Sequence, residues 1–193
     1  MTSLATRLRV QCIVTNYDAA SAAVAAGATA IQLRLKGEST DAVVQRGTPL
    51  RALPAMFIVN DDVRAALALH ADGVHLGDDD PGAADALAAG LIVGMSASFA
   101  DDAAARERSG ASYIGCGPVW STPTKADAGE PVGLDGLALV CRAVSIPVVA
   151  IGGVDETNAA SCVNAGAAGV AVVRAVPAAR AIRRAVDAAL LAR

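Results

Sequence analysis

The sequence is poor in aromatic residues, which make up only 3% of the chain although hydrophobic residues make up 54%. Alanine supplies much of this apolar content, with 46 of the 193 residues. A core of such small side chains favours elements that lie close together, as helices do when they cover a sheet. The length suits one domain or at most two small ones, and the composition shows no break or linker. We therefore expect a single domain over residues 1–193.

A long hydrophobic run is also missing. The longest stretch of apolar residues and glycine covers residues 86–95, ten residues. That is half of the ~20 residues that a membrane-spanning helix needs. The first ten residues, MTSLATRLRV, lack the apolar core of a signal peptide. We therefore expect a cytoplasmic protein without a membrane partner.

Basic clusters and closely spaced cysteines are absent as well. The net charge is -3, from 16 basic and 19 acidic residues, and no polybasic run occurs, which argues against a nucleic-acid partner. The four cysteines, Cys12, Cys116, Cys141 and Cys162, form no C-x-x-C pair and have no metal-ligand spacing. We expect them to be buried, reduced thiols.

A recurring pattern organises the chain: an alanine-rich, helix-like stretch ends in Gly or Asp, and a short apolar strand follows. It occurs at residues 25–36, 70–77, 109–117 and 164–173. Glycine after a helix adopts the left-handed conformation that a Cβ disfavours. A strand that is apolar throughout is typical of a parallel sheet buried on both faces.

This pattern predicts eight strands, at residues 10–15, 30–35, 56–60, 73–76, 91–96, 112–116, 147–151 and 169–173. Helical patterns fill most of the intervals, as at residues 62–69, 101–109, 134–144 and 157–165. Eight strands that alternate with helices predict an α/β protein of the (β/α)8 TIM-barrel type. An open doubly wound sheet is the alternative, although no glycine-rich dinucleotide loop follows the first strand.

The barrel is expected to be compact, with shortened first two crossovers. The first, residues 16–28, leaves room for about two helical turns. The second contains Gly47, Pro49 and Pro54, which leave little room for a helix beyond residues 40–45.

Candidate site residues are the polar side chains at the carboxyl ends of the strands, where barrel enzymes carry their active sites. Gln32, Arg34 and Lys36 alternate with apolar residues at the end of the second strand, so all three are expected on one face. Charged groups on a barrel strand are costly unless they meet a ligand or a counter-charge. A solvated strand edge or a core ion pair is the alternative.

Acidic residues follow the third and fourth strands. Asn60 and Asp61 end the third strand, and Asp62 is expected to cap the next helix. The fourth strand runs into three consecutive aspartates, residues 78–80, whose mutual repulsion indicates a nearby cation. Oxygen ligands from two loops suit Mg²⁺ that is shared with a phosphate. A solvated acidic turn before Pro81 is the alternative.

Ser96 ends the fifth strand, and the sixth leads into an unusual loop, residues 115–125. This loop contains Thr122, Thr124 and Lys125, and on a rigid scaffold it is typical of a lid or an anion clamp. An ordinary surface loop is the alternative. We expect His75 to be a hydrogen-bonded interior histidine and leave it out of the site.

The last two strands predict a phosphate site. Gly153 follows the seventh strand, and Val173 and Arg174 end the eighth. Backbone amides at these two neighbouring strand ends commonly bind phosphate in such barrels. For the Arg174 side chain, an outward ion pair with Asp155 or Glu156 is the alternative.

Together, six segments resemble the thiamine-phosphate synthase family, and they occur in that family's order. They are residues 32–36 (QLRLK), 58–61 (IVND), 77–80 (GDDD), 94–97 (GMSA), 115–125 (GCGPVWSTPTK) and 149–153 (VAIGG). The resemblance covers almost the whole chain. It implies a transferase that joins 4-amino-2-methyl-5-hydroxymethylpyrimidine diphosphate to 4-methyl-5-hydroxyethylthiazole phosphate, releasing pyrophosphate by a dissociative route.

The resemblance also implies roles for the candidate residues. The pyrimidine diphosphate would be held by Gln32, Arg34, Lys36, Asn60, Ser96 and Lys125. Mg²⁺ would be held by Asp61 and Asp80. The thiazole phosphate would be held by Thr122, Pro123, Thr124, Gly153, Val173 and Arg174. Arg34, Lys36 and Lys125 would be catalytic, because they would stabilise the charge that grows on the leaving diphosphate.

Three features depart from the family's pattern: Asp78 stands where Gln is usual, Arg174 stands where Ser is usual, and the first two crossovers are short. Two alternatives follow from them. One is a thiazole tautomerase-like enzyme, although such relatives generally lack the Asn-Asp and Gln-x-Arg-x-Lys patterns. The other is a degenerate, non-catalytic phosphate-binding paralogue. A homo-oligomer is compatible with the barrel wall that short crossovers would expose.

Overall fold

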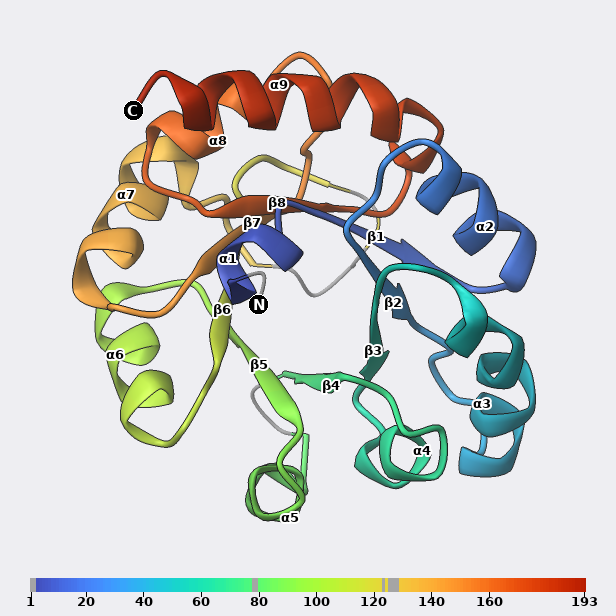
Figure 1. The fold of residues 1–193 in the computed structure, drawn as a ribbon. Coiled ribbons are helices and arrows are strands. Elements are labelled where there is room, and N and C mark those ends of the chain that lie inside the picture. The colour runs from blue at the N-terminus through green and yellow to red at the C-terminus, as the bar shows by residue number, and fades with distance from the viewer. Residues whose placement is uncertain (1–2, 78–79, 123, 125–128) are drawn as a thin grey trace.

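The computed structural model describes residues 3–77, 80–122, 124 and 129–193, and it is a closed parallel barrel (Figure 1). The eight strands follow one another around the barrel in chain order, and β1 closes it by pairing with β8. The strands are β1 (Val10–Val14), β2 (Ala30–Leu33), β3 (Met56–Asn60), β4 (Gly73–Leu76), β5 (Ile92–Ala97), β6 (Tyr113–Cys116), β7 (Val148–Ile151) and β8 (Gly169–Val172). The predicted (β/α)8 barrel is confirmed, and each strand lies within the predicted range or one residue beyond it.

A ring of helices surrounds the barrel (Figure 1). They are α1 (Leu4–Arg7), α2 (Tyr17–Ala25), α3 (Thr40–Gly47), α4 (Val63–Ala68), α5 (Ala83–Ala88), α6 (Ala100–Arg108), α7 (Gly133–Ala143), α8 (Ala159–Asn164) and α9 (Ala179–Leu191), with the 3-10 helices η1 (Thr48–Ala52) and η2 (Val176–Ala178). Among the described residues, no helix has the length and hydropathy that crossing a membrane requires.

Left-handed glycines end several of the helices as the recurring pattern predicts, whereas after α4 the left-handed residue is neither Gly nor Asp. Gly27, Gly110 and Gly166 follow α2, α6 and α8 with φ values of 101°, 101° and 124°. After α4 the same place is taken by His70, with a φ of 47°. The predicted cap at Asp62 is also confirmed, because its carboxylate accepts a hydrogen bond of 2.8 Å from the Ala65 amide.

The first two crossovers are not the only short ones. Helix α2 has nine residues, close to the two turns expected. Helix α3 runs two residues beyond the predicted end at residue 45, and η1 follows it directly. Pro49 lies in the first turn of η1, where the missing N–H of proline is tolerated. Helices α4, α5 and α8 have six residues each, so short helices occur all around the barrel.

Two apolar cores lie on the two faces of the sheet. The larger one packs the outward strand residues against the helices, and it contains the buried free thiols of Cys12, Cys116 and Cys162. The smaller one fills the barrel interior with residues such as Ile58, and Leu4 and Leu8 from α1 and its C-terminal end join it. Figure 1 shows α1 lying across one end of the barrel. The amino end of the barrel is therefore packed, and ligands must enter at the other end.

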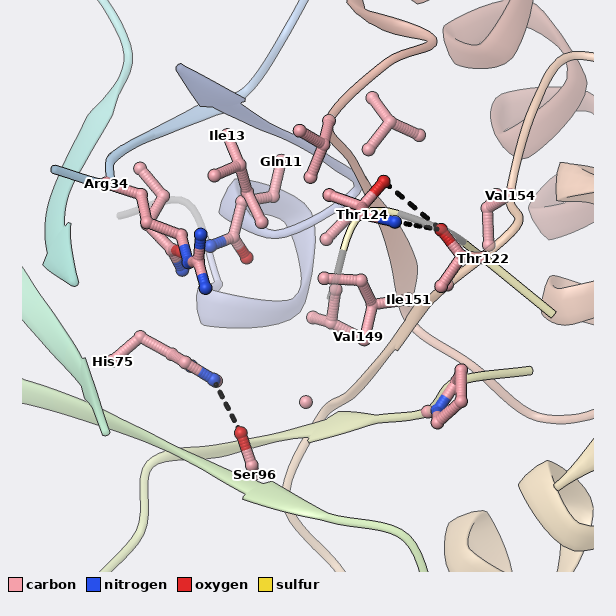
Figure 2. Close-up of a pocket in the computed structure, with 18 of the residues that line it drawn as sticks. Gln11, Ile13, Arg34, His75, Ser96, Thr122, Thr124, Val149, Ile151 and Val154 are labelled. Carbon is pink, nitrogen blue, oxygen red and sulfur yellow. Dashed lines mark hydrogen bonds between the residues drawn. The ribbon is translucent and has the colours of Figure 1, made fainter. Parts of the chain in front are cut away.

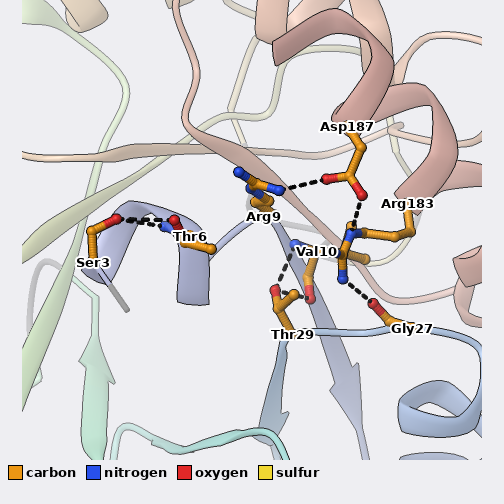
Figure 3. Close-up of polar contacts among 8 residues, drawn as sticks. All are labelled: Ser3, Thr6, Arg9, Val10, Gly27, Thr29, Arg183 and Asp187. Atoms are coloured by element: carbon orange, nitrogen blue, oxygen red, sulfur yellow. Dashed lines mark hydrogen bonds and ion pairs between the residues drawn. The ribbon is translucent and has the colours of Figure 1, made fainter. Parts of the chain in front are cut away.

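A polar cluster fastens the last helix to the first strand (Figure 3). The Asp187 carboxylate on α9 accepts hydrogen bonds from Arg9 at 2.9 Å and from Arg183 at 2.6 Å. Arg183 also donates to the Gly27 carbonyl at 3.1 Å, in the loop that leads to β2. These side chains are about one-third exposed, so each ion pair contributes only ~0–1 kcal/mol. Their structural role is to hold α9 over the pair of strands, β8 and β1, that closes the barrel.

The start of β8 generates a stability prediction, because it lies unusually close to the chain before β1. A Cβ at Gly169 would lie 2.1 Å from the Leu8 carbonyl oxygen and 2.7 Å from the Arg9 Cα. Both are backbone atoms, so the strands must separate to admit the methyl group. We expect Gly169→Ala to lower the free energy of unfolding by about 1–3 kcal/mol, as measured by urea denaturation. An unchanged urea midpoint would contradict this close approach.

Candidate active site

A cavity of about 540 Å³ opens at the carboxyl end of the barrel. This volume is in the range that small-molecule sites usually have. Residues from every strand or the loop after it line the cavity. The part of the wall that the strands form includes the apolar side chains of Ile13, Val149 and Ile151. Figure 2 shows the neighbouring Gln11 and Arg34 side chains and the His75 side chain pointing into this common space.

The cavity brings together the predicted site residues that the structure describes. They are Gln32, Arg34, Lys36, Asn60, Asp61, Asp80, Ser96, Thr122, Thr124, Gly153, Val173 and Arg174. Pro123 and Lys125 lie outside the described residues, as does Asp78. The predicted residues that the structure describes thus lie around one cavity, and their roles in binding and catalysis stay predictions.

The end of β2 supplies the basic side of the cavity. Gln32 is buried, at 2% exposure, and the strand ends one residue later. Arg34 and Lys36 lie just beyond the strand but still face the cavity, as their alternation predicted. Within the described part of the chain, neither forms an ion pair closer than 4.0 Å, so the alternative of a core ion pair is not what the structure contains.

Asp61 and Asp80 form the acidic side. Asp61 has a left-handed backbone, with a φ of 64°, and its amide donates to the His75 carbonyl at 2.9 Å. The Asp80 carboxylate accepts a hydrogen bond of 2.6 Å from the Gly77 amide. Burial and the adjacent Asp80 carboxyl raise the pKa of Asp61 to about 6, while Lys36 and Arg34 oppose the rise. Two loops thus place two carboxyl groups side by side in the cavity.

The chemistry of this carboxylate pair fits a hard divalent cation. Among the described residues, no group of three or more His, Cys, Asp or Glu side chains is arranged to enclose a metal ion. A site with two carboxylates suits Mg²⁺, which usually keeps several waters and shares its remaining positions with substrate phosphates. A cation there would also relieve the repulsion between the two carboxylates.

Sequence reasoning missed two polar residues that lie deep in the barrel, Gln11 on β1 and Tyr113 on β6. Both line the cavity and are at most 2% exposed. The Tyr113 hydroxyl lies 3.0 Å from Nδ1 of His75, whose Nε2 lies 3.2 Å from the Ser96 hydroxyl. His75 is thus the hydrogen-bonded interior histidine that was expected, although it also lines the cavity. Burial lowers its pKa to about 4, so the ring is neutral at pH 7.

A signal for Gln11 was present in the sequence. The first strand is otherwise apolar, and Gln11 shares with Ile13 the face that alternation directs into the barrel. A buried amide must be matched by polar partners. What the sequence could not show is that Tyr113 of β6 lies beside Gln11, because that proximity depends on closure of the barrel.

Glycines hold the loop after β6 against the end of β7. A Cβ at Gly153 would lie 2.6 Å from the Trp120 Cβ, and Gly153 itself has a φ of 68°. The Trp120 amide donates to the Gly152 carbonyl at 3.0 Å. Beyond it, the Thr122 hydroxyl donates to that of Thr124 at 3.1 Å (Figure 2). The threonines therefore lie on the cavity rim beside the glycine turn.

Arg174 lies exposed on the neighbouring part of the rim, in the turn after β8, the strand that pairs with β7. The alternative of an outward ion pair with Asp155 or Glu156 is not formed among the described residues. The Asp155 carboxylate instead accepts hydrogen bonds from the Thr157 amide at 2.8 Å and the Thr157 hydroxyl at 2.6 Å. The Arg174 guanidinium is thus available to an anion at the mouth.

Comparison with known proteins adds independent information. A family model described as thiamine monophosphate synthase matches residues 10–176. The thiamine-phosphate synthase of Chloroflexus aurantiacus is 47% identical over 164 residues, which cover 82% of this chain and 76% of that protein. The thiamine-phosphate synthase of Moorella thermoacetica is 46% identical over 161 residues, covering 80% and 77%.

A solved structure agrees with these sequence matches. The thiamine phosphate pyrophosphorylase of Pyrococcus furiosus superposes with a TM-score of 0.89 and 35% sequence identity. The match covers 97% of this chain and all of that one, 100%.

The proximity of the two carboxyl groups generates a prediction for Asp61→Asn. Asparagine tolerates the left-handed backbone and removes one negative charge. We expect its thermal midpoint in chelator to equal or exceed that of the parent protein. Mg²⁺ with inorganic pyrophosphate should stabilise the parent, by about 2.7 kcal/mol at a hundred-fold excess over the dissociation constant, but not the variant.

Asp62→Asn is the matched control for this prediction, because asparagine also caps helices. It should keep the stabilisation by Mg²⁺ and pyrophosphate. A clear loss of stability of Asp61→Asn in chelator would contradict a repulsive carboxylate pair.

Proposed function

Because this chain belongs to the thiamine monophosphate synthase family, we propose that it makes thiamine phosphate. In this proposal, the enzyme is a transferase that condenses 4-amino-2-methyl-5-hydroxymethylpyrimidine diphosphate with 4-methyl-5-hydroxyethylthiazole phosphate and releases pyrophosphate. The observation that carries the proposal is the meeting of a carboxylate pair with Arg34 and Lys36 in one cavity. To bind a diphosphate together with a divalent cation, a site needs carboxylates for the cation and basic side chains for the diphosphate. We also propose that residues 1–193 act as one cytoplasmic domain, as the sequence leads us to expect.

Each substrate has its own side of the cavity in this proposal. Gln32, Asn60 and Ser96 lie within the strands, deeper than Arg34 and Lys36, and would hold the pyrimidine ring. Arg34, Lys36 and Lys125 would hold its diphosphate. The rim residues would hold the thiazole phosphate, and they are Thr122, Pro123, Thr124, Gly153, Val173 and Arg174.

The reaction breaks the bond between the pyrimidine methylene carbon and the diphosphate oxygen, and the electron pair leaves with the diphosphate. Arg34, Lys36 and Lys125 would stabilise this negative charge as it grows. Mg²⁺ held by Asp61 and Asp80 would supply further positive charge to the diphosphate when bound.

The thiazole nitrogen then donates its lone pair to the methylene carbon, forming the new carbon–nitrogen bond. No proton is lost from that nitrogen, so this step needs orientation of the two substrates more than a base. The apolar side chains of Ile13, Val149 and Ile151 line the part of the wall that the strands form. They would keep water away from the electron-poor carbon.

The alternative functions need fewer of these groups. A tautomerase-like enzyme or a phosphate-binding paralogue would use the rim at Gly153 but would not require Asp61 and Asp80 beside Arg34 and Lys36. The gathering of all four in one cavity therefore favours the synthase.

The proposed function is tested by incubating the purified protein with both substrates and Mg²⁺, and measuring thiamine phosphate and pyrophosphate. We expect the two products in equal amounts. Omission of either substrate or addition of a chelator should abolish them. Folded protein that forms neither product at micromolar enzyme would overturn the proposal.

Lys125→Ala generates a kinetic prediction. If Lys125 meets the charge that grows on the departing diphosphate, its loss should lower kcat by about 100–1000-fold, the cost of one such transition-state contact. The Michaelis constant for the thiazole phosphate should change much less. Steady-state kinetics with each substrate varied in turn separates these parameters. An unchanged kcat with a raised Michaelis constant would show that Lys125 only binds substrate.

Arg174→Ser generates a binding prediction, because serine is the residue usual in the family. An arginine at the rim can donate two parallel hydrogen bonds to a phosphate. We expect the variant to bind the thiazole phosphate about ten-fold more weakly, with a smaller dependence of affinity on salt. Calorimetric titration at two salt concentrations measures both quantities.

The matched control for Arg174 is Arg180→Ser on the exposed side of α9, where, among the described residues, the guanidinium donates to the Ala25 carbonyl. This control should bind the thiazole phosphate as the parent does. Tighter binding by Arg174→Ser would show instead that the arginine obstructs the phosphate site.

A further inference from the structure

A row of polar side chains, joined by two consecutive hydrogen bonds, crosses the barrel interior beneath the charged part of the cavity. Burial raises the pKa of Tyr113 on β6, and the Gln11 side-chain amide of β1 opposes that rise, so the two side chains lie close together. The Tyr113 hydroxyl lies 3.0 Å from Nδ1 of His75 on β4, and Nε2 of His75 lies 3.2 Å from the Ser96 hydroxyl on β5. Figure 2 shows the His75–Ser96 contact at the cavity wall. Four side chains from four strands thus end at a hydroxyl group that faces the cavity.

Two glycines make the space that this chain occupies. A Cβ at Gly94 would lie 2.1 Å from Cζ of Tyr113 and 2.4 Å from its hydroxyl oxygen. A Cβ at Gly115 would lie 2.8 Å from Cε1 of His75. The strand register pairs Gly94 with Tyr113 and Gly115 with Ser96. Each ring therefore lies over a residue without a side chain, which holds its polar atoms in line.

The chemistry of the four groups sets the direction of the protons. In the neutral imidazole of His75, one ring nitrogen carries hydrogen and the other carries a lone pair. A phenol is a stronger acid than an aliphatic alcohol, so the Tyr113 O–H is the better donor to that lone pair. The Gln11 amide beside the Tyr113 oxygen favours the same arrangement, in which the phenolic proton goes to Nδ1. Nε2 of His75 then carries the hydrogen and donates it to the Ser96 oxygen.

We propose that Gln11 and Tyr113 are positioning residues that act through His75 to make the Ser96 hydroxyl a hydrogen-bond donor toward the substrate. Ser96 accepts from His75, so its own proton is directed into the cavity. The ring nitrogens and phosphate oxygens of the pyrimidine diphosphate are acceptors, so the substrate part of this inference rests on the proposed function. With the opposite tautomer, Ser96 would donate to His75 and present only lone pairs to an acceptor-rich substrate.

The first experiment reads the tautomer directly by ¹⁵N–¹H correlation spectroscopy of the histidine rings. The chain contains two histidines, so His70→Asn leaves only the signals of His75. Asparagine is suited to the left-handed backbone at that position. We expect hydrogen on Nε2 in this background and a shift toward the Nδ1 form when Tyr113→Phe is added. Hydrogen on Nδ1 without that substitution would overturn the inference.

The second experiment is a double-mutant cycle of Tyr113→Phe and Ser96→Ala, followed by kcat/KM for the pyrimidine diphosphate. Each single variant should lose about ten-fold, as expected for one hydrogen bond. The double variant should lose no more than Ser96→Ala alone, because both substitutions remove the same donor. Multiplicative losses would show that Tyr113 acts independently of Ser96 and would overturn the proposal.

Controls separate positioning from folding. Tyr17→Phe and Ser109→Ala, at partly exposed positions outside the cavity, should change neither the tautomer nor kcat/KM. If Tyr113→Phe does not fold, Gln11→Met removes the first donor with little change of volume and should produce a smaller shift toward the Nδ1 form. No shift in a folded Gln11→Met would then count against the proposal.

The two experiments also distinguish failure of this inference from failure of the proposed function. Hydrogen on Nε2 in a protein that makes no thiamine phosphate would refute the function and leave the network standing. Hydrogen on Nδ1 in an active enzyme would overturn the network alone.

Discussion

Closure of the sheet by pairing of β1 with β8 is the constraint on which the rest of the structure depends. It turns one face of every strand into an interior surface and brings the eight carboxyl ends around a single opening. Residues as distant in the chain as Gln11 and Tyr113 become neighbours only for this reason. On the outside of the barrel, the cluster of Arg9, Arg183 and Asp187 holds α9 over the same pair of strands. Both this cluster and the site therefore depend on the pairing of β1 with β8.

The polarity of the barrel interior changes along its axis in the order that desolvation requires. The amino end is filled by apolar side chains such as Met56 and Ile58. Neutral hydrogen-bonding groups occupy the middle, where burial keeps His75 uncharged. Charged groups such as Arg34 come last, where solvent and ligands can reach them. A charge placed deeper would cost several kcal/mol without a partner, so the position of the site follows from the packing of the core.

Close backbone approach is the second condition for this site. Gly94 and Gly115 admit two rings into the barrel, and Gly153 admits the loop after β6 to the rim of β7. These glycines touch no substrate in the proposed reaction. They nevertheless decide where Ser96 and Thr122 can lie, because a methyl group at any of the three would collide with a neighbour.

The sequence by itself determined the alternation of apolar strands with short helices, the left-handed helix ends and the polar residues at the strand ends. These are local properties of period and composition, which is why residues from Gln32 to Arg174 could be assigned to one end of a barrel. It did not determine that α3 extends to Gly47, since a proline that ends one helix can begin another. Only the tertiary structure decided that the Asp61 and Asp80 carboxyl groups lie side by side and that Tyr113, His75 and Ser96 form one hydrogen-bonded chain. Such contacts join strands that are distant in sequence, and they exist only once closure has set the register of every strand against its neighbours.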